Sequence, residues 1–233
     1  MKSRNWMAGG FIRRVAVAAV IGGILSCSHA SRAAGTMGTP ITIVALGDSL
    51  TAGYLLKPEE AFPAQLQMAL EAKGHKVRIE NAGVSGDTSA GGLQRLDWSL
   101  QGGADAVIVE LGANDALRGI DPALTRTALD KIMTAIKAKG ADILLAGMKA
   151  PNNYGADYQK SFDAIFPELA EKHGAALYPF FLDGVALNPK LVLADGLHPT
   201  ADGVAEIVKR ILPSVEGLIA KVEARKSASA KSP

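Results

Sequence analysis

The chain has 233 residues, of which 48% are hydrophobic and 21% are charged, a composition typical of a globular protein. Its single cysteine excludes an intrachain disulfide and a cysteine-based zinc cluster. The formal net charge of +2 comes from basic residues near the two ends, whereas acidic side chains outnumber basic ones over residues 35–220. This acidic body argues against nucleic acid as a partner.

The first 34 residues have the pattern of an export signal peptide. Basic residues precede an apolar run from Val15 to Leu25, and small residues follow through Ala34. The run is shorter than the roughly 20 residues that span a bilayer, so we expect cleavage near residues 30–34, no transmembrane span, and a periplasmic or secreted protein. The residues before Cys27 also resemble a lipobox, and the alternative is a lipoprotein anchored by lipid on Cys27.

Residues 38–220 alternate short apolar runs with amphipathic segments, which predicts one domain of the α/β class. Runs rich in Val, Ile and Leu between helical segments indicate buried parallel strands. The expected strands lie at 41–46, 76–80, 106–111, 142–147 and 175–178. Right-handed crossovers then place a five-stranded parallel sheet between two helical layers, as a three-layer α/β/α fold.

Amphipathic helices are expected between these strands and after the last one, near 63–73, 122–139, 157–173 and 201–219. The last two contain Pro167 and Pro213, so a kink or a restart is expected at each proline. One stripe of the second, at Leu124, Ala128 and later positions, is expected to face the sheet. Residues 221–233 are rich in Lys, Ser and Ala and are expected to form a disordered basic tail.

Polar residues follow each of the first three strands, in segments 47–50, 81–87 and 112–115. The carboxyl ends of parallel strands share one edge of a sheet, and ligands bind at that edge. A hydroxyl, glycine amides and a carboxamide are therefore expected to meet there, and acyl transfer requires these groups.

Ser49 is the candidate nucleophile, and a serine hydroxyl needs a neighbouring base. His198 is better placed for this role than His75 or His173, which fall in a turn and at a helix end. Asp195 lies three residues before His198, a spacing that lets its carboxylate orient the ring. Each residue also has a plain structural interpretation, because His198 fits an ordinary loop and Asp195 fits a turn.

Asn114 and Gly86 are the candidate oxyanion donors. A side-chain N–H of Asn114 can point from a strand end, and Gly86 lets the backbone approach a substrate closely. The structural alternatives are a helix cap or turn at Asn114 and a positive φ at Gly86. Neither Ser49 nor Ser85 lies in a Gly-x-Ser-x-Gly elbow, so the usual α/β-hydrolase signature is absent.

Together these residues resemble the four blocks of the SGNH (GDSL) hydrolase family. The blocks are in the family's order, and the likeness covers nearly all of residues 40–212. They read Gly47-Asp48-Ser49-Leu50, Gly86, Gly112-x-Asn114-Asp115 and Asp195-x-x-His198. Longer matches resemble the periplasmic thioesterase/lysophospholipase and arylesterase branch, at 49–54, 84–88, 110–115 and 151–154. The resemblance implies the SGNH hydrolase fold, which is flavodoxin-like.

The resemblance also implies a role for each candidate residue. Ser49 would be the nucleophile, His198 the base and Asp195 the residue that orients it. The oxyanion hole would consist of the Ser49 and Gly86 amides and the Asn114 side chain. We therefore expect a serine esterase or thioesterase, without cofactor or metal, that hydrolyses aryl esters, acyl thioesters or lysophospholipids through an acyl-enzyme.

Three other functions are alternatives. A carbohydrate O-acetylesterase of the same family normally needs aromatic sugar platforms, and few aromatic residues lie near the four blocks. A two-metal phosphoesterase needs several histidines, and only His198 lies in a block. An exported solute-binding lipoprotein would explain Cys27 and the acidic body, but it would make the set of Ser49, Asp195 and His198 a coincidence.

Overall fold

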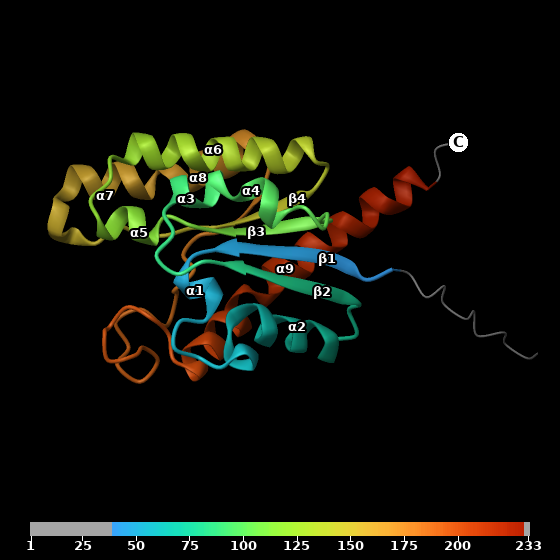
Figure 1. Cartoon of the computed structure of the whole chain (residues 1–233), viewed down its shortest axis with the longest axis horizontal. Coiled ribbons are helices and arrows are strands. Elements are labelled where there is room, and N and C mark those ends of the chain that lie inside the picture. The colour runs from blue at the N-terminus through green and yellow to red at the C-terminus, as the bar shows by residue number, and fades with distance from the viewer. Residues whose placement is uncertain (1–38, 231–233) are drawn as a thin grey trace, which may run out of the picture. The chain divides into compact units, whose positions relative to one another are not determined.

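The structure is a computed structural model that describes residues 39–230. The expected signal peptide at 1–34, with Cys27, lies outside this range. The described chain forms a five-stranded parallel sheet with helices on both faces (Figure 1). All five expected strands are present, as β1 (Ile41–Gly47), β2 (Val77–Gly83), β3 (Ala106–Glu110), β4 (Asp142–Ala146) and β5 (Ala176–Tyr178).

The strand order is β2-β1-β3-β4-β5, and every neighbouring pair is parallel. This is the flavodoxin-like order, so the predicted fold class is confirmed. The order reverses at β1, which pairs with both β2 and β3. At the carboxyl edge Gly47 of β1 lies in register with Gly83 on one side and Glu110 on the other, so the segments that follow these three strands begin side by side.

The helices form two layers, one on each face of the sheet (Figure 1). One layer contains α3 (Ser89–Gln94), α4 (Leu96–Ser99), α6 (Pro122–Ala138), α7 (Ala156–Asp163) and α8 (Ile165–His173). The other contains α2 (Phe62–Ala72) and α9 (Ala201–Ser229). The short helices α1 (Ser49–Ala52) and α5 (Ala113–Leu117) follow β1 and β3 directly. Single 3₁₀ turns occur at Pro58–Glu60 and Asn152–Tyr154.

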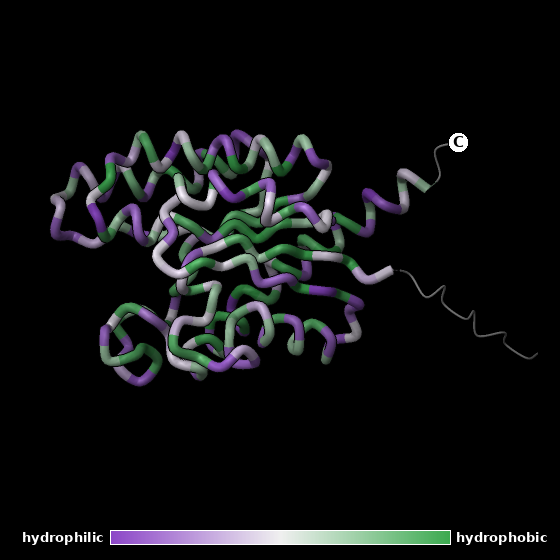
Figure 2. Tube along the Cα trace, viewed as in Figure 1, coloured by the Kyte–Doolittle hydropathy of each residue, from purple (hydrophilic) through white to green (hydrophobic). Residues whose placement is uncertain are grey.

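Hydrophobic residues concentrate on the strands and on the inward faces of the helices (Figure 2). Helix α6 illustrates the cause. Asp121 caps its first turn by accepting a hydrogen bond from the Ala123 amide at 2.9 Å, and Pro122 occupies the first helical position. Leu124, which was predicted to face the sheet, is exposed, and the buried residue of that turn is Thr125; Ala128 is buried as predicted.

The two prolines in the later helices have different effects. The predicted helix at 157–173 is broken at Ala164, and Pro167 falls in the first turn of α8, where its missing N–H costs no helical hydrogen bond. In contrast, α9 continues through Pro213 and runs to Ser229. None of the described helices, α9 included, has the length and apolar character needed to cross a membrane.

The prediction of a disordered tail from Lys221 is wrong as far as Ser229, because α9 continues to that residue and contacts the domain as far as Lys226. Val222 is fully buried. Arg225 pairs with Asp142 at 3.0 Å, and Lys226 pairs with Asp105 at 2.8 Å. These acids lie at the amino-terminal edge of the sheet, far away in sequence, so local composition gave no sign of the contacts.

Candidate active site

Ser49 begins α1 immediately after β1, and a tight turn fixes its position. The Asp48 carboxylate caps α1 by accepting a hydrogen bond from the Leu50 amide at 2.9 Å. Gly47 has no space for a side chain, since a Cβ there would lie 2.1 Å from the Thr51 hydroxyl. The turn therefore holds the Ser49 hydroxyl at the carboxyl edge of the sheet, where the strand pattern predicted it.

His198 lies on the loop between β5 and α9 and contacts both residues that the sequence paired with it. Its Nε2 is 2.9 Å from Ser49 Oγ, and its Nδ1 is 2.7 Å from Asp195 Oδ2. A carboxylate only accepts hydrogen bonds, so Nδ1 carries the proton and Nε2 is free to accept from the serine hydroxyl. The three predicted side chains thus form one continuous hydrogen-bonded chain.

Asp195 also forms the turn that its alternative interpretation predicted. Its Oδ1 accepts hydrogen bonds from the His198 amide at 3.0 Å and the Leu197 amide at 2.9 Å. These two backbone bonds, together with the one from the His198 ring, lower the pKa of Asp195 to about 2. The carboxylate is therefore ionised across the working pH range, and the turn itself aims it at the imidazole.

Tyr54 packs against the histidine, which sequence reasoning did not foresee. Its ring centroid lies 4.4 Å from that of His198 at an interplanar angle of 37°. Its amide donates to the Ser49 carbonyl at 3.1 Å. Gly53, with φ of +84°, turns the chain between them. The only signal in the sequence is that Tyr54 closes the 49–54 motif.

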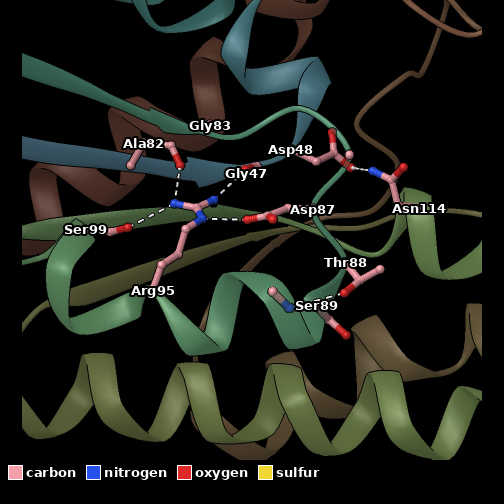
Figure 3. A network of polar contacts seen from close by, with 12 residues as sticks. Gly47, Asp48, Ala82, Gly83, Asp87, Thr88, Ser89, Arg95, Ser99 and Asn114 are labelled. Carbon is pink, nitrogen blue, oxygen red and sulfur yellow. Dashed lines mark hydrogen bonds and ion pairs between the residues drawn. The ribbon is translucent and has the colours of Figure 1, made fainter.

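The oxyanion candidates flank the serine on the segments after β2 and β3. Gly86 has φ of +84°, as its structural alternative predicted. Asn114 does not cap α5, because Gly112 occupies that position. Instead, Asn114 Nδ2 donates to Asp48 Oδ2 at 3.1 Å (Figure 3). No hydrogen bond from the Ser49 or Gly86 amide to another described residue is present, so both donors are available at this edge.

Beneath the serine lies a buried pair of carboxyl groups, Asp48 and Glu110, that the sequence did not reveal. Glu110 is fully buried and accepts hydrogen bonds from the Thr51 hydroxyl at 2.7 Å and the Asp48 amide at 3.4 Å. Neither carboxyl forms an ion pair with a described cation. Burial raises the pKa of Asp48 to about 6. Burial, reinforced by the charge of Asp48, raises the pKa of Glu110 well above its usual value.

Arg95, between α3 and α4, links the carboxyl ends of β1 and β2 (Figure 3). Its guanidinium donates to the carbonyls of Gly47 and Ala82, both at 2.8 Å. It also pairs with Asp87 at 2.5 Å, the residue directly after Gly86. One partly buried cation therefore sets the position of the Gly86 turn relative to the serine turn.

Asp115 fixes the position of its neighbour Asn114 in a similar way. Its carboxylate accepts from the Ser89 amide at 2.8 Å, the Ser89 hydroxyl at 2.5 Å and the Thr125 hydroxyl at 3.0 Å. The acceptor thus joins α5 to α3 and α6. These bonds fix the short helix that carries Asn114.

A cavity of about 410 Å³ opens at Ser49 and His198. A volume in this range accommodates a small-molecule substrate. Its wall is mainly apolar, with Leu50, Ala116, Leu117, Met148, Phe180, Leu182, Leu187 and Leu197 among the lining residues. A larger hollow of about 750 Å³ lies against α6 and α7 and includes neither Ser49 nor His198.

Residues 45–205 match the family model of the GDSL-like lipase/acylhydrolase family. The chain belongs to this family. It is 41% identical over 174 residues to an arylesterase of Vibrio mimicus, covering 73% of this chain and 87% of that protein. It is 40% identical over 179 residues to thioesterase 1/protease 1/lysophospholipase L1 of Escherichia coli strain K12, covering 76% of this chain and 85% of that protein.

Solved structures of GDSL-family enzymes have the same fold. The esterase AlinE4, described as a member of the SGNH-hydrolase family, is 49% identical, with a TM-score of 0.67 over 78% of this chain and 98% of its own. TesA is 37% identical, with a TM-score of 0.73 over 76% of this chain and 99% of its own. The resemblance to the SGNH (GDSL) family is confirmed.

Membership of the GDSL family makes this chain a carboxylic ester hydrolase. The relatives that it matches do not support the phosphoesterase and solute-binding alternatives. Within residues 39–230, no group of three or more His, Cys, Asp and Glu side chains is arranged to hold a metal ion.

Proposed function

We propose that this protein hydrolyses carboxylic esters and thioesters through an acyl-enzyme at Ser49. The observation that carries the proposal is the contact of 2.9 Å between Ser49 Oγ and His198 Nε2, with Asp195 on the opposite ring nitrogen at 2.7 Å. His198 takes the hydroxyl proton while Oγ forms a bond to the carbonyl carbon. It then gives that proton to the departing alcohol or thiol.

The second half of the cycle releases the acid. His198 removes a proton from water, the resulting hydroxide attacks the acyl carbon, and the bond to Ser49 Oγ breaks. The proton returns to Oγ, which regenerates the enzyme. Asp195 remains ionised throughout, because its pKa of about 2 lies far below the working pH, and it stabilises the imidazolium that forms in each half.

In both halves a negative charge develops on the carbonyl oxygen. The available amides of Ser49 and Gly86 and the side chain of Asn114 supply the donors for it. An asparagine NH₂ group has two hydrogens. Asn114 can therefore keep its bond to Asp48 Oδ2 and still donate to the substrate, so the contact with Asp48 sets the direction of the catalytic donor.

The substrates that we propose are aryl esters, acyl thioesters and lysophospholipids with small to medium acyl groups. The apolar wall of the 410 Å³ cavity supports an acyl chain as the occupant. The names of the matched relatives, an arylesterase and a thioesterase/lysophospholipase, support the same classes.

We also propose that the protein is exported, to the periplasm or beyond the cell. The charge and hydropathy pattern of residues 1–34 supports this location. Mass spectrometry of the mature amino terminus tests it: cleavage near 30–34 agrees with a free exported protein, and a lipid on Cys27 identifies the anchored form. An intact terminus in exported fractions would contradict both.

The test of the chemistry is hydrolysis of 4-nitrophenyl acetate, butyrate and octanoate by the wild type, Ser49→Ala and Ser85→Ala. Ser85 is an exposed serine nearby with no role in the proposal, so it is a matched control. We expect turnover and labelling by a fluorophosphonate probe in the wild type and in Ser85→Ala, with or without EDTA. Both should be lost in Ser49→Ala, and turnover that survives there would overturn the proposal.

A further inference from the structure

The cavity at Ser49 has one ammonium group on its mainly apolar wall. Lys149 lies just beyond the carboxyl end of β4 and is exposed. It lines the cavity together with Phe180, and its Nζ lies 5.3 Å from the centroid of the Phe180 ring. A ring face attracts a cation at this distance, so the ring holds the ammonium at the cavity wall.

The charge of Lys149 is not neutralised by a described carboxylate. None of the side chains that line the cavity is acidic, and Lys149 forms no ion pair with any described residue. Two acids on neighbouring segments have other partners: Asp163 accepts from the Ala150 amide, and Asp183 pairs with Arg210. Acidic residues outnumber basic ones over residues 35–220. A lysine without an ion pair at the substrate cavity is therefore a candidate for binding a negative group of the substrate.

A second cation without an acidic partner among the described residues is Arg118, on the segment after α5. The Arg118 guanidinium donates to the Gly86 carbonyl at 2.9 Å and forms no ion pair with a described residue. Arg118 does not line the cavity and the ionised Asp195 is bound to His198, so Lys149 is the charged group on the wall that is free to meet a substrate. An ammonium there favours a substrate whose apolar chain enters the cavity while a negative group stays near Lys149.

We propose that Lys149 is an anion subsite that selects amphiphilic esters carrying a carboxylate, sulfonate or phosphate. The inference rests on the proposed function, because it names a class of ester within it. The negative group can belong to the leaving alcohol or thiol, or to the far end of the acyl chain. Both sources present the same chemistry to the ammonium, and the substrates below separate them.

The test compares three esters with an eight-carbon acyl group. 4-Nitrophenyl octanoate is neutral, 4-nitrophenyl hydrogen suberate carries a carboxylate at the acyl end, and 4-(octanoyloxy)benzenesulfonate carries a sulfonate on the leaving group. The proteins are the wild type, Lys149→Met, Lys149→Arg and Lys131→Met. Lys131 is an exposed lysine of α6 that does not line the cavity, so it controls for net charge.

The quantity measured is the ratio of kcat/KM for each anionic ester to kcat/KM for the neutral one. For at least one anionic ester, Lys149→Met should lower this ratio about fivefold at low ionic strength, the size typical of a solvent-exposed charge pair. Lys149→Arg should retain the ratio, and about 1 M salt should remove most of the difference by screening. Lys131→Met should have the ratio of the wild type.

Two results would overturn the proposal: equal ratios in wild type and Lys149→Met for both anionic esters, or the same loss in Lys131→Met. Inhibition provides a check without any variant. Octanesulfonate should inhibit hydrolysis of the neutral ester by the wild type better than 1-octanol does, and equal inhibition would count against the subsite. The Ser49→Ala variant keeps the proposals distinct, because its inactivity upholds the esterase mechanism whatever Lys149 does.

Discussion

Strand β3 has a carboxyl group at each end, and the two ends have opposite electrostatic environments. Asp105, just before the strand, accepts a hydrogen bond from the Thr42 amide and pairs with Lys226 at 2.8 Å. Its partial burial opposes ionisation, but the bonds from Lys226 and Thr42 prevail and lower the pKa of Asp105. Glu110, the last residue of the strand, is fully buried beside Asp48, and both pKa values are raised.

The difference shows that one edge of the sheet stabilises the fold and the other positions the candidate catalytic residues. At the amino-terminal edge, acids meet the cations of α9, and each contact favours the folded state. At the carboxyl edge, two buried carboxyl groups without a described cation support the turns that carry Ser49 and Asn114, an arrangement that costs stability and fixes geometry. The predictions below test whether catalysis and stability divide between the edges in this way.

The largest effect should follow a change at the catalytic edge, in Asp195→Asn. If Asp195 fixes the histidine tautomer, kcat should fall on the order of 10⁴-fold. The measurement is hydrolysis of 4-nitrophenyl butyrate, with Asp202→Asn, an exposed acid in the first turn of α9, as the matched control. A loss below tenfold would mean that another group orients His198.

Asn114→Ala should have the next largest effect. Removing a side-chain oxyanion donor typically costs about 3–4 kcal/mol of transition-state stabilisation, a loss of 10²–10³-fold in kcat. The variant also removes the hydrogen bond to Asp48, so urea unfolding is measured beside the kinetics. Turnover near that of the wild type would remove Asn114 from the oxyanion site.

A chain that ends after residue 220 tests the other edge. It loses the buried Val222 and the ion pairs of Lys221, Arg225 and Lys226. Burial of a valine is worth about 1.5–3 kcal/mol and each exposed ion pair up to about 1 kcal/mol, so the free energy of unfolding should fall by about 3 kcal/mol. Turnover per folded molecule should stay as it is. A large loss of kcat at full folding would contradict the division between the edges.

The smallest effect concerns the pH dependence of stability. A carboxyl whose folded pKa is raised holds a proton that the unfolded chain has lost, so stability falls as pH rises from the unfolded value toward the folded one. For Asp48 this window runs from 3.8 to about 6. Asp105 acts in the opposite sense, because its lowered pKa adds stability above 3.8 that is lost as pH falls through the folded value.

Stability should therefore be greatest in weakly acidic solution and lower at neutral pH. Glu110→Gln removes one of the two carboxyl groups with a raised pKa, so it should reduce the decline of the unfolding free energy toward neutral pH. Urea unfolding from pH 4 to pH 8 measures both curves. Parallel curves for wild type and variant would show that Glu110 does not titrate in this range.

Much of the fold could be predicted from sequence because its signals are local. Apolar runs between helical segments located all five strands, and the topological rules for parallel sheets gave their common edge. The contacts among Ser49, His198 and Asp195 followed from the residues after those strands and from a three-residue spacing. On α6 the apolar pattern placed Leu124 inward, whereas the buried residue of that turn is the polar Thr125, whose hydroxyl donates to Asp115.

The rest could not be predicted, because it depends on contacts between distant residues. Arg95 binds backbone carbonyls that any sequence would possess, so no residue pattern marks its partner Gly47. The buried contact between Glu110 and the Asp48 turn arises from the register of β1 against β3. The final turns of α9 are ordered by acids more than 80 positions earlier in the chain, and composition alone made that segment look unstructured.

The cavity wall has a consequence for how this protein can diverge. Met148, Lys149 and Pro151 come from the loop after β4, and Phe180 and Leu187 come from the loop after β5. The nucleophile and its neighbouring donors come instead from the segments after β1, β2 and β3. Changes in the loop after β4, and side-chain changes at Phe180 and Leu187, can therefore alter which ester is accepted, provided that the loop after β5 keeps His198 and Asp195 in place. Proteins that descend from this one can therefore differ in substrate and still use the same reacting residues.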